Sequence, residues 1–172
     1  MDSVRIVRLA PEHVERLGSL LIASHEELRH LMPGIPEQPR TVAEEITRLT
    51  EMLEASPEDR AEFAIEYNGV VVGDIAISGI VRGPLQSANV GLFVAPEARG
   101  SGVATRAIAA ACDFAFGELK LHRLSAGAQP SNLGSIRALE RNGFERIGLT
   151  RGFLFVDGAW RDHVQFQKLA DD

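Results

Sequence analysis

The sequence contains little of what would place it outside a reducing compartment or in a membrane. One cysteine, Cys112, stands among 172 residues, so an internal disulfide is excluded. No apolar run approaches the roughly 20 residues that span a bilayer. The first nine residues mix an aspartate and two arginines with apolar residues, unlike a signal peptide. We therefore expect a cytoplasmic protein with no membrane contact, in which Cys112 packs in the core.

An excess of basic charge is also absent. The chain has 18 Lys and Arg against 24 Asp and Glu, a net charge of −6. It shows no basic run and no interleaving of basic with aromatic residues, which argues against a direct nucleic-acid partner. A local acidic groove that attracts a cationic substrate stays compatible with this balance.

Linkers, internal repeats and low-complexity tracts are likewise missing. A length of 172 residues with 45% hydrophobic and 24% charged residues is typical of one globular domain. We therefore expect residues 1–172 to form a single domain.

Hydrophobic periodicity predicts an α+β domain with a mixed sheet. One helix is expected from Pro11 to the proline-rich stretch that starts at Pro33, and another from a Thr41–Glu44 capping box to Ser56-Pro57. Two further helices are expected from Val103 and over Ser135–Arg141. The Asn68-Gly69 pair predicts a hairpin turn. The expected strands are Val4–Leu9, Ala61–Tyr67, Val70–Val81, Asn89–Val94, Leu124–Ala128, Phe144–Ile147, Phe153–Val156 and Trp160–Leu169.

The stretch from 88 to 115 reads as a short apolar strand, a glycine loop and a helix of small residues. A helix N-terminus leaves amides without intrahelical partners, and the preceding glycines let phosphates approach the backbone. The loop lacks the Lys-Ser/Thr pair of a P-loop and the third glycine of a dinucleotide fingerprint. It therefore predicts a different pyrophosphate cradle, with a plain strand-to-helix turn as the alternative.

Two motifs resemble the GNAT superfamily of acyl-CoA-dependent N-acetyltransferases. The first is Arg-x-x-Gly-x-Ala, which begins at Arg99. The second combines Asn-x-x-Ser, which begins at Asn132, with Glu-Arg-Asn-Gly-Phe, which begins at Glu140. The Asn132 motif, together with Trp-x-Asp-His from Trp160, is similar to the Rim-type branch, which contains ribosomal-protein N-terminal acetyltransferases. The resemblance covers essentially the whole chain.

This resemblance implies a single GNAT-like domain: a mixed, mostly antiparallel sheet with a splayed parallel strand pair, flanked by helices. Acetyl-CoA would lie between the diverging strands Asn89–Val94 and Leu124–Ala128, and Gly91 would contribute a bulge that opens them. No metal is implied. The residues expected to bind acetyl-CoA are Phe93, Val94, Arg99, Gly100, Ser101, Gly102, Val103, Ala104, Thr105 and Asn132. The alternative for Arg99 is an exposed, solvated side chain. The alternative for Asn132 is capping of the following helix.

The resemblance also implies direct attack of an amine on the thioester, with Ser135 as the candidate proton donor to the leaving thiolate. The branch commonly has a glutamate base where this chain has Asn89, and an amide accepts no proton at neutral pH. Asn89 is therefore a candidate for binding the amine or a water. Four other residues are equally open candidates for the base: Asp162, His163, Glu66 and Tyr67. A weak base favours an α-amine over lysine, because the α-amine has the lower pKa.

The preferred hypothesis is an acetyl-CoA-dependent N-acetyltransferase acting on a primary amine, such as the N-terminus of a ribosomal or other protein. The alternatives are a catalytically idle acyl-CoA sensor or partner-binding module, and an enzyme that detoxifies an antibiotic or amino-acid analogue. An exposed last strand would also allow a homodimer.

Overall fold

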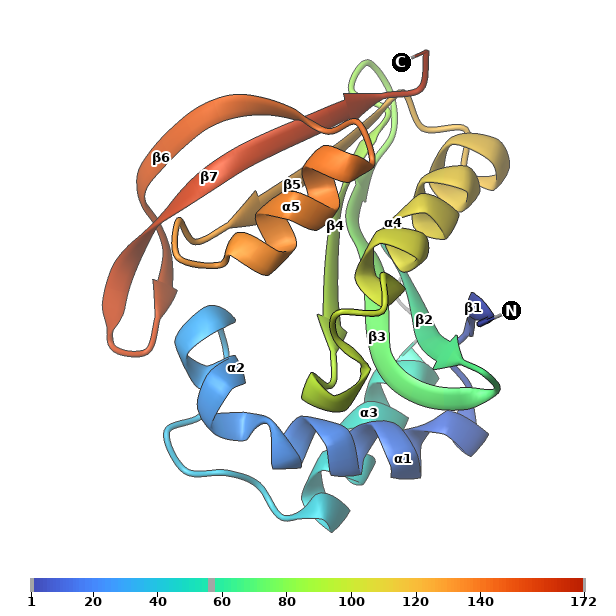
Figure 1. Ribbon diagram of the computed structural model, residues 1–172, viewed down its shortest axis with the longest axis vertical. Coiled ribbons are helices and arrows are strands. Elements are labelled where there is room, and N and C mark those ends of the chain that lie inside the picture. Colours follow the sequence, from blue (N-terminus) through green and yellow to red (C-terminus); the bar gives the residue numbers. More distant parts are fainter. Residues whose placement is uncertain (1, 56–57, 172) are drawn as a thin grey trace.

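A seven-stranded sheet organises the fold. The computed structural model describes residues 2–55 and 58–171 (Figure 1). The strands follow the order β1-β2-β3-β4-β5-β7-β6, and every neighbouring pair is antiparallel except β4–β5. This confirms the predicted α+β architecture with one parallel pair. The strands are β1 (Val4–Arg8), β2 (Arg60–Tyr67), β3 (Val70–Val81), β4 (Ser87–Val94), β5 (Arg123–Ala128), β6 (Glu145–Val156) and β7 (Ala159–Leu169).

Helices cover both faces of this sheet. In Figure 1, α4 and α5 lie in front of the strands, whereas α3 lies behind them. None of the described helices is both long enough and apolar enough to cross a bilayer. The helices are α1 (Pro11–Ala23), α2 (His25–Leu31), α3 (Val42–Ala55), α4 (Val103–Asp113) and α5 (Leu133–Arg141), with a 3₁₀ turn at Pro96–Ala98 and a π-helical turn at Phe114–Glu118.

The first helical segment is broken, in contrast to the single helix predicted from its apolar stripe. Ser24 ends α1 and precedes α2, with a φ of −102° and a ψ of 11°. The break lets Leu28 of α2 join Leu20 of α1 in a small buried cluster around Phe93. Because the apolar spacing carries no information about this distant contact, the change of direction is visible only in the fold.

Two local signals are confirmed. Thr41 and Glu44 form the predicted capping box, with Thr41 N–H donating to the Glu44 carboxylate at 2.8 Å and Glu44 N–H donating to the Thr41 hydroxyl at 3.2 Å. Asn68 and Gly69 both have positive φ, 52° and 81°, as the hairpin turn requires. The predicted helix end at Ser56-Pro57 lies outside the described residues.

The strand β6 is longer than expected. In place of separate strands at Phe144–Ile147 and Phe153–Val156, one strand runs along β7, and its register shifts near Arg146 and again beyond Thr150. The polar and glycine residues between the two expected strands break the alternating pattern. The edge of β7 nevertheless supplies backbone partners on both sides of the second shift.

The two larger buried clusters lie on opposite faces of the sheet. Ile75 and Ile108 belong to the cluster under α4, whereas Ala64, Leu17 and Leu49 belong to the cluster under α1 and α3. Cys112 is buried in the first cluster, and burial raises the pKa of its thiol to about 11. The thiol is therefore protonated at neutral pH, which agrees with the expected packing role.

Candidate functional site

The strands β4 and β5 separate after a short paired stretch, and Figure 1 shows them diverging. Beyond the last pair, residues 90–94 and 126–128 have no register partner across this edge. The predicted bulge at Gly91 is wrong, because the β3–β4 register runs unbroken through Gly91 and shifts only between Ser78 and Val81. The gap therefore comes from the divergence of β5. The paired residues are Ser87 with Arg123, Ala88 with Leu124 and Asn89 with Ser125.

The loop after β4 has the conformation expected of an anion cradle. Gly100 and Gly102 have φ values of 80° and 74°, and Gly102 precedes α4 without a side-chain cap. The first amides of α4, at residues 103–105, therefore lack intrahelical partners. Arg106 donates to the carbonyl of exposed Ser101 at 2.7 Å. The positive end of the helix thus lies next to a loop that presents no bulky side chain.

Arg99 is held in a fixed position despite its partial exposure. Its guanidinium donates to both carboxylate oxygens of Glu27, at 2.7 and 3.0 Å. Its Nε donates to the Val94 carbonyl at 2.9 Å. These bonds tie the loop to α2 and to the end of β4, so Arg99 is exposed, as the alternative expects, but its guanidinium is held by protein partners.

The other end of α2 contacts the turn between β6 and β7. Asp157 in that turn accepts from Arg29 at 2.9 Å and lies 2.6 Å from the Nδ1 of His30. The short helix therefore connects the glycine loop to the distant hairpin.

Phe93 and Val94 form the end of β4 beside the gap. A Cβ placed on Gly73 of β3 would come within 2.0 Å of the Phe93 carbonyl oxygen, so the backbones approach closely only because residue 73 is glycine. The Phe93 carbonyl therefore lies against β3, and the Val94 carbonyl already accepts from Arg99.

Asn132 and Ser135 begin α5, directly after β5. The Asn132 side chain accepts from the Ser135 amide at 3.3 Å, so the N-cap alternative is observed. Asn142 at the end of the same helix donates to the Thr105 carbonyl at 3.0 Å and thereby joins α5 to α4.

Asn89 is exposed and stands at the last paired position of β4. Of the substitute bases, Glu66 is paired with Arg5 at 2.6 Å, and both Glu66 and Tyr67 lie on β2, which β3 separates from β4. Asp162 accepts from the Gly152 amide at 2.8 Å within the β6–β7 hairpin. His163 is buried, with Nδ1 at 3.1 Å from the Arg161 carbonyl.

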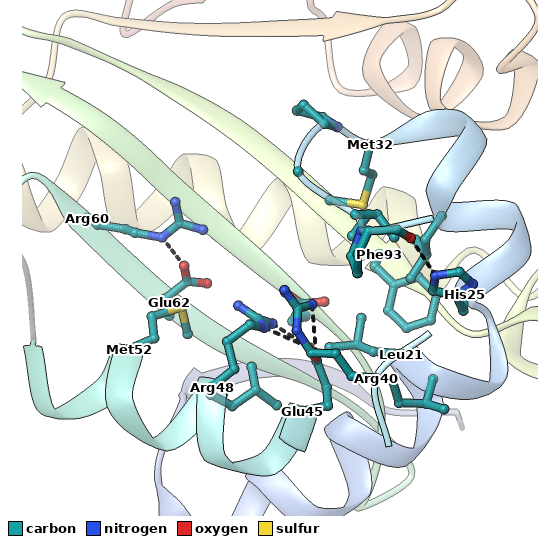
Figure 2. A pocket seen from close by; sticks show the side chains of 18 residues that line it. Leu21, His25, Met32, Arg40, Glu45, Arg48, Met52, Arg60, Glu62 and Phe93 are labelled. Carbon is teal, nitrogen blue, oxygen red and sulfur yellow. Dashed lines mark hydrogen bonds and ion pairs between the residues drawn. The ribbon is translucent and has the colours of Figure 1, made fainter. Parts of the chain in front are cut away.

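Sequence reasoning missed a pocket of about 240 Å³ on the opposite face of the sheet from α4. Figure 2 shows its polar part, where Arg40 and Arg48 contact Glu45, and Arg60 contacts Glu62. The apolar part is lined by Leu21, Leu28, Met32, Ile35 and Phe93.

Asp74 on β3 also lines this pocket. Burial raises the pKa of its carboxyl from the ordinary 3.8 to about 7; the Glu62 carboxylate adds to this rise, whereas Arg48 and Arg60 oppose it. One signal was available in the sequence, because Asp74 is the single charged residue in the apolar run of β3.

Comparison with known proteins identifies the family. A profile of the acetyltransferase (GNAT) domain matches residues 3–145. A probable N-acetyltransferase of Bacillus subtilis is 39% identical over 118 residues, which are 69% of this chain and 65% of that protein. The ribosomal protein uS5-alanine N-acetyltransferase of Escherichia coli is 33% identical over 94 residues, which are 55% of this chain and 48% of that protein. The match thus spans about two thirds of the length of the B. subtilis protein and about half of the length of the E. coli enzyme.

A solved structure gives the same result over a larger part of the fold. Mycobacterium smegmatis RimJ in complex with a CoA disulfide aligns with a TM-score of 0.88 and 30% identity, covering 98% of this chain and 82% of that one. The resemblance to the GNAT superfamily and its Rim-type branch is therefore confirmed.

Replacing Asp74 with asparagine is expected to stabilise the protein more at high pH than at low pH. Since the folded-state pKa is raised to about 7 from 3.8, the folded state holds more protons than the unfolded chain between these values. Wild-type stability therefore falls as the pH rises through this window, and asparagine removes that loss. In urea denaturation, the stability gain of Asp74→Asn should increase by about 3 kcal/mol between about pH 5 and about pH 8. The exposed Asp113→Asn serves as the control, and an equal gain at both pH values for Asp74→Asn contradicts the raised pKa.

Proposed function

The chain belongs to the acetyltransferase (GNAT) family, and we propose that it transfers an acetyl group from acetyl-CoA to a primary amine. The observation that carries this proposal is the parting of β4 and β5 after Asn89, directly upstream of the glycine loop at the start of α4. A CoA molecule is an extended amide chain with a diphosphate at one end. The strand edges suit the chain, and the loop suits the diphosphate.

In this proposal, the cofactor is held mainly by backbone. Residues 100–105 bind the diphosphate through their amides, with Thr105 adding its hydroxyl. Phe93 and Val94 bind the pantetheine arm along β4. Arg99 acts by fixing the loop against Glu27, and Asn132 orders the start of α5 beside the cofactor.

The chemistry proposed is direct attack of the amine on the thioester while both substrates are bound. Holding the two reactants together supplies the main gain in rate. A backbone amide near Phe93 polarises the thioester carbonyl, and the Ser135 hydroxyl protonates the leaving thiolate. Asn89, at the point where the strands part, binds the amine or a water.

The proposed acceptor is an α-amine at the N-terminus of a ribosomal or other protein. The E. coli relative carries a ribosomal-protein alanine in its name, which favours this class. An α-amine has an ordinary pKa of about 7.7–8.0 against about 10.4 for lysine, so more of it is neutral at pH 7. Beyond the site, exposed Ile147, Leu149 and Phe155 on edge strand β6 suit contact with the acceptor protein or with a second copy of the chain.

An acceptor panel tests the proposed function. Thiol release from acetyl-CoA would be measured with an alanine-starting peptide, the same peptide blocked at its N-terminus but carrying an internal lysine, and spermidine. We expect kcat/KM to be about tenfold or more higher for the free α-amine. Preference for lysine or spermidine contradicts the α-amine assignment. Binding of acetyl-CoA without release, across a panel that also includes amino-acid analogues and aminoglycosides, indicates the idle sensor.

Gly102→Asp is expected to weaken CoA binding sharply, because it places a carboxylate beside the diphosphate. Gly102→Asn is the matched control, since asparagine has the same shape and also tolerates positive φ at this position. Calorimetry should give a Kd about tenfold or more higher for the aspartate variant than for the asparagine variant, which corresponds to about 1.4 kcal/mol or more. Equal affinities would remove the diphosphate from this loop.

Ser135→Ala is expected to lower kcat about 10–100-fold while it changes CoA affinity little, if the hydroxyl donates a proton. The backbone amide of residue 135 still bonds to Asn132 in this variant, so the helix cap is kept. Steady-state kinetics and calorimetry on the same preparation separate the two effects. Equal losses in both would make Ser135 a binding residue.

A further inference from the structure

The carboxyl of Asp74 points to the face of the sheet opposite α4. Its neighbour Ile75 belongs to the buried cluster under α4, and successive side chains of a strand alternate between faces. Asp74 stands in register with Ala64 of β2 and Phe93 of β4. Ala64 belongs to the cluster under α1 and α3, and Phe93 packs with Leu20 and Leu28. Asp74 therefore lies one strand away from the open edge of β4.

The Oδ1 atom of Asp74 is shielded from solvent and has no hydrogen-bond partner among the described residues. A shielded carboxylate oxygen without a donor is costly, so its presence requires an explanation. The Asp74 side chain as a whole is half-buried, and it lines a pocket together with residues 32–36 of the loop between α2 and α3. Asp74 thus combines a shielded oxygen that has no donor with a place in the lining of a pocket.

We propose that Asp74 binds the acceptor's ammonium group through its carboxylate and takes the proton that the nitrogen must lose before it attacks. This assignment rests on the proposed function. Asp74, on β3, would be the base that Asn89, on β4, cannot be. The ammonium is the donor that the buried oxygen lacks, and the apolar lining around Phe93 holds the rest of the acceptor's first residue.

The proton balance of the step is complete. The ammonium gives one proton to the Asp74 carboxylate, directly or through one water, and the neutral nitrogen attacks the thioester carbon. A carbon–nitrogen bond forms and the carbon–sulfur bond breaks. The second nitrogen proton goes to the leaving thiolate, by way of Ser135, and the products are the N-acetyl amide and the CoA thiol. Asp74 then releases its proton to solvent.

The charges around Asp74 suit this role. The surrounding titratable and charged groups come from β2, α3, the segment before α3, and α2: Glu62 and Arg60, Glu45 and Arg48, Arg40, and His25. Arg48 and Arg60 are each paired with a glutamate, so none of the described ion pairs in the pocket engages Asp74. With a pKa of about 7, its carboxylate is about half ionised at neutral pH. A general base works best when its pKa lies near the operating pH in this way.

The same value predicts which amines react. Proton transfer from an α-ammonium to this carboxylate has an equilibrium constant of about 0.1–0.2, whereas transfer from a lysine ammonium has one below about 0.001. An α-ammonium therefore gives its proton to this carboxylate more readily than a lysine ammonium does.

The test compares Asp74→Asn with Asp113→Asn, which removes an exposed carboxylate at the end of α4. With an alanine-starting peptide, kcat/KM should fall about 100-fold for Asp74→Asn and stay unchanged for Asp113→Asn, while CoA affinity is unchanged in both. A folded Asp74→Asn variant with wild-type kcat/KM overturns the assignment.

The pH profile adds a readout that a structural role would not move. In the wild type, kcat/KM should rise with pH through an apparent pKa near 7, and this limb should disappear in Asp74→Asn. Glu62→Gln leaves Asp74 in place and removes a carboxylate that raises its pKa, so the limb should shift to lower pH. An unmoved limb in Glu62→Gln and a retained limb in Asp74→Asn each contradict the proposal.

Peptide affinity separates this proposal from the proposed function. In the presence of CoA, which cannot react, Asp74→Asn should bind the peptide about tenfold more weakly than the wild type. If the wild type releases no thiol with any amine but shows this difference, the enzyme function fails and the amine site stands. If the wild type turns over, and Asp74→Asn matches it in both peptide affinity and kcat/KM, the amine site fails and the enzyme function stands.

Discussion

The early end of the β4–β5 pairing is the constraint on which the rest of the structure depends. Backbone amides and carbonyls inside a protein need partners, and two strands that part after Asn89 leave such groups facing a gap. β5 is held away from β4 by its six-residue pairing with β7, and β4 is held by β3. The gap is therefore built into the sheet. The glycine loop follows β4 and α5 follows β5, so both helix N-termini arrive at the open end of the gap.

The sheet also divides the site into two sides. The glycine loop and the start of α5 belong to the side of α4, whereas the pocket of Asp74 lies beneath α1, α2 and α3. Only β4 stands between them at Phe93. In the proposed reaction, the two substrates would enter from opposite faces and meet at the strand edge without competing for the same surface, which fits a reaction in which both are bound together.

The parts of the fold that could be predicted are those that depend on neighbouring residues. The capping box at Thr41, the turn at Asn68 and the loop from Arg99 to Gly102 each carry their geometry in a few adjacent side chains. The break at Ser24 and the continuous β6 depend on distant partners, Phe93 and β7, so the local pattern was misleading there. For the site, the sequence predicts where a cofactor would bind but not which residues face that position from the other strands. Asp74 is conspicuous in its strand, yet its burial and missing donor depend on β2, β4 and α3, which no spacing rule connects.

Helix α2 has a consequence for how the two substrates affect each other. Through Glu27 it holds the arginine of the glycine loop, and through Arg29 and His30 it holds the tip of the β6–β7 hairpin, while Leu28 between them lines the pocket. A ligand that displaces this seven-residue segment cannot do so without changing the loop at its other side. In the proposed function, the factor by which a bound acceptor peptide changes the affinity for CoA equals the factor by which bound CoA changes the affinity for the peptide, because the coupling between two sites is reciprocal. The ion pairs that α2 makes to the loop and to the hairpin are partly exposed, so this connection weakens as the ionic strength rises.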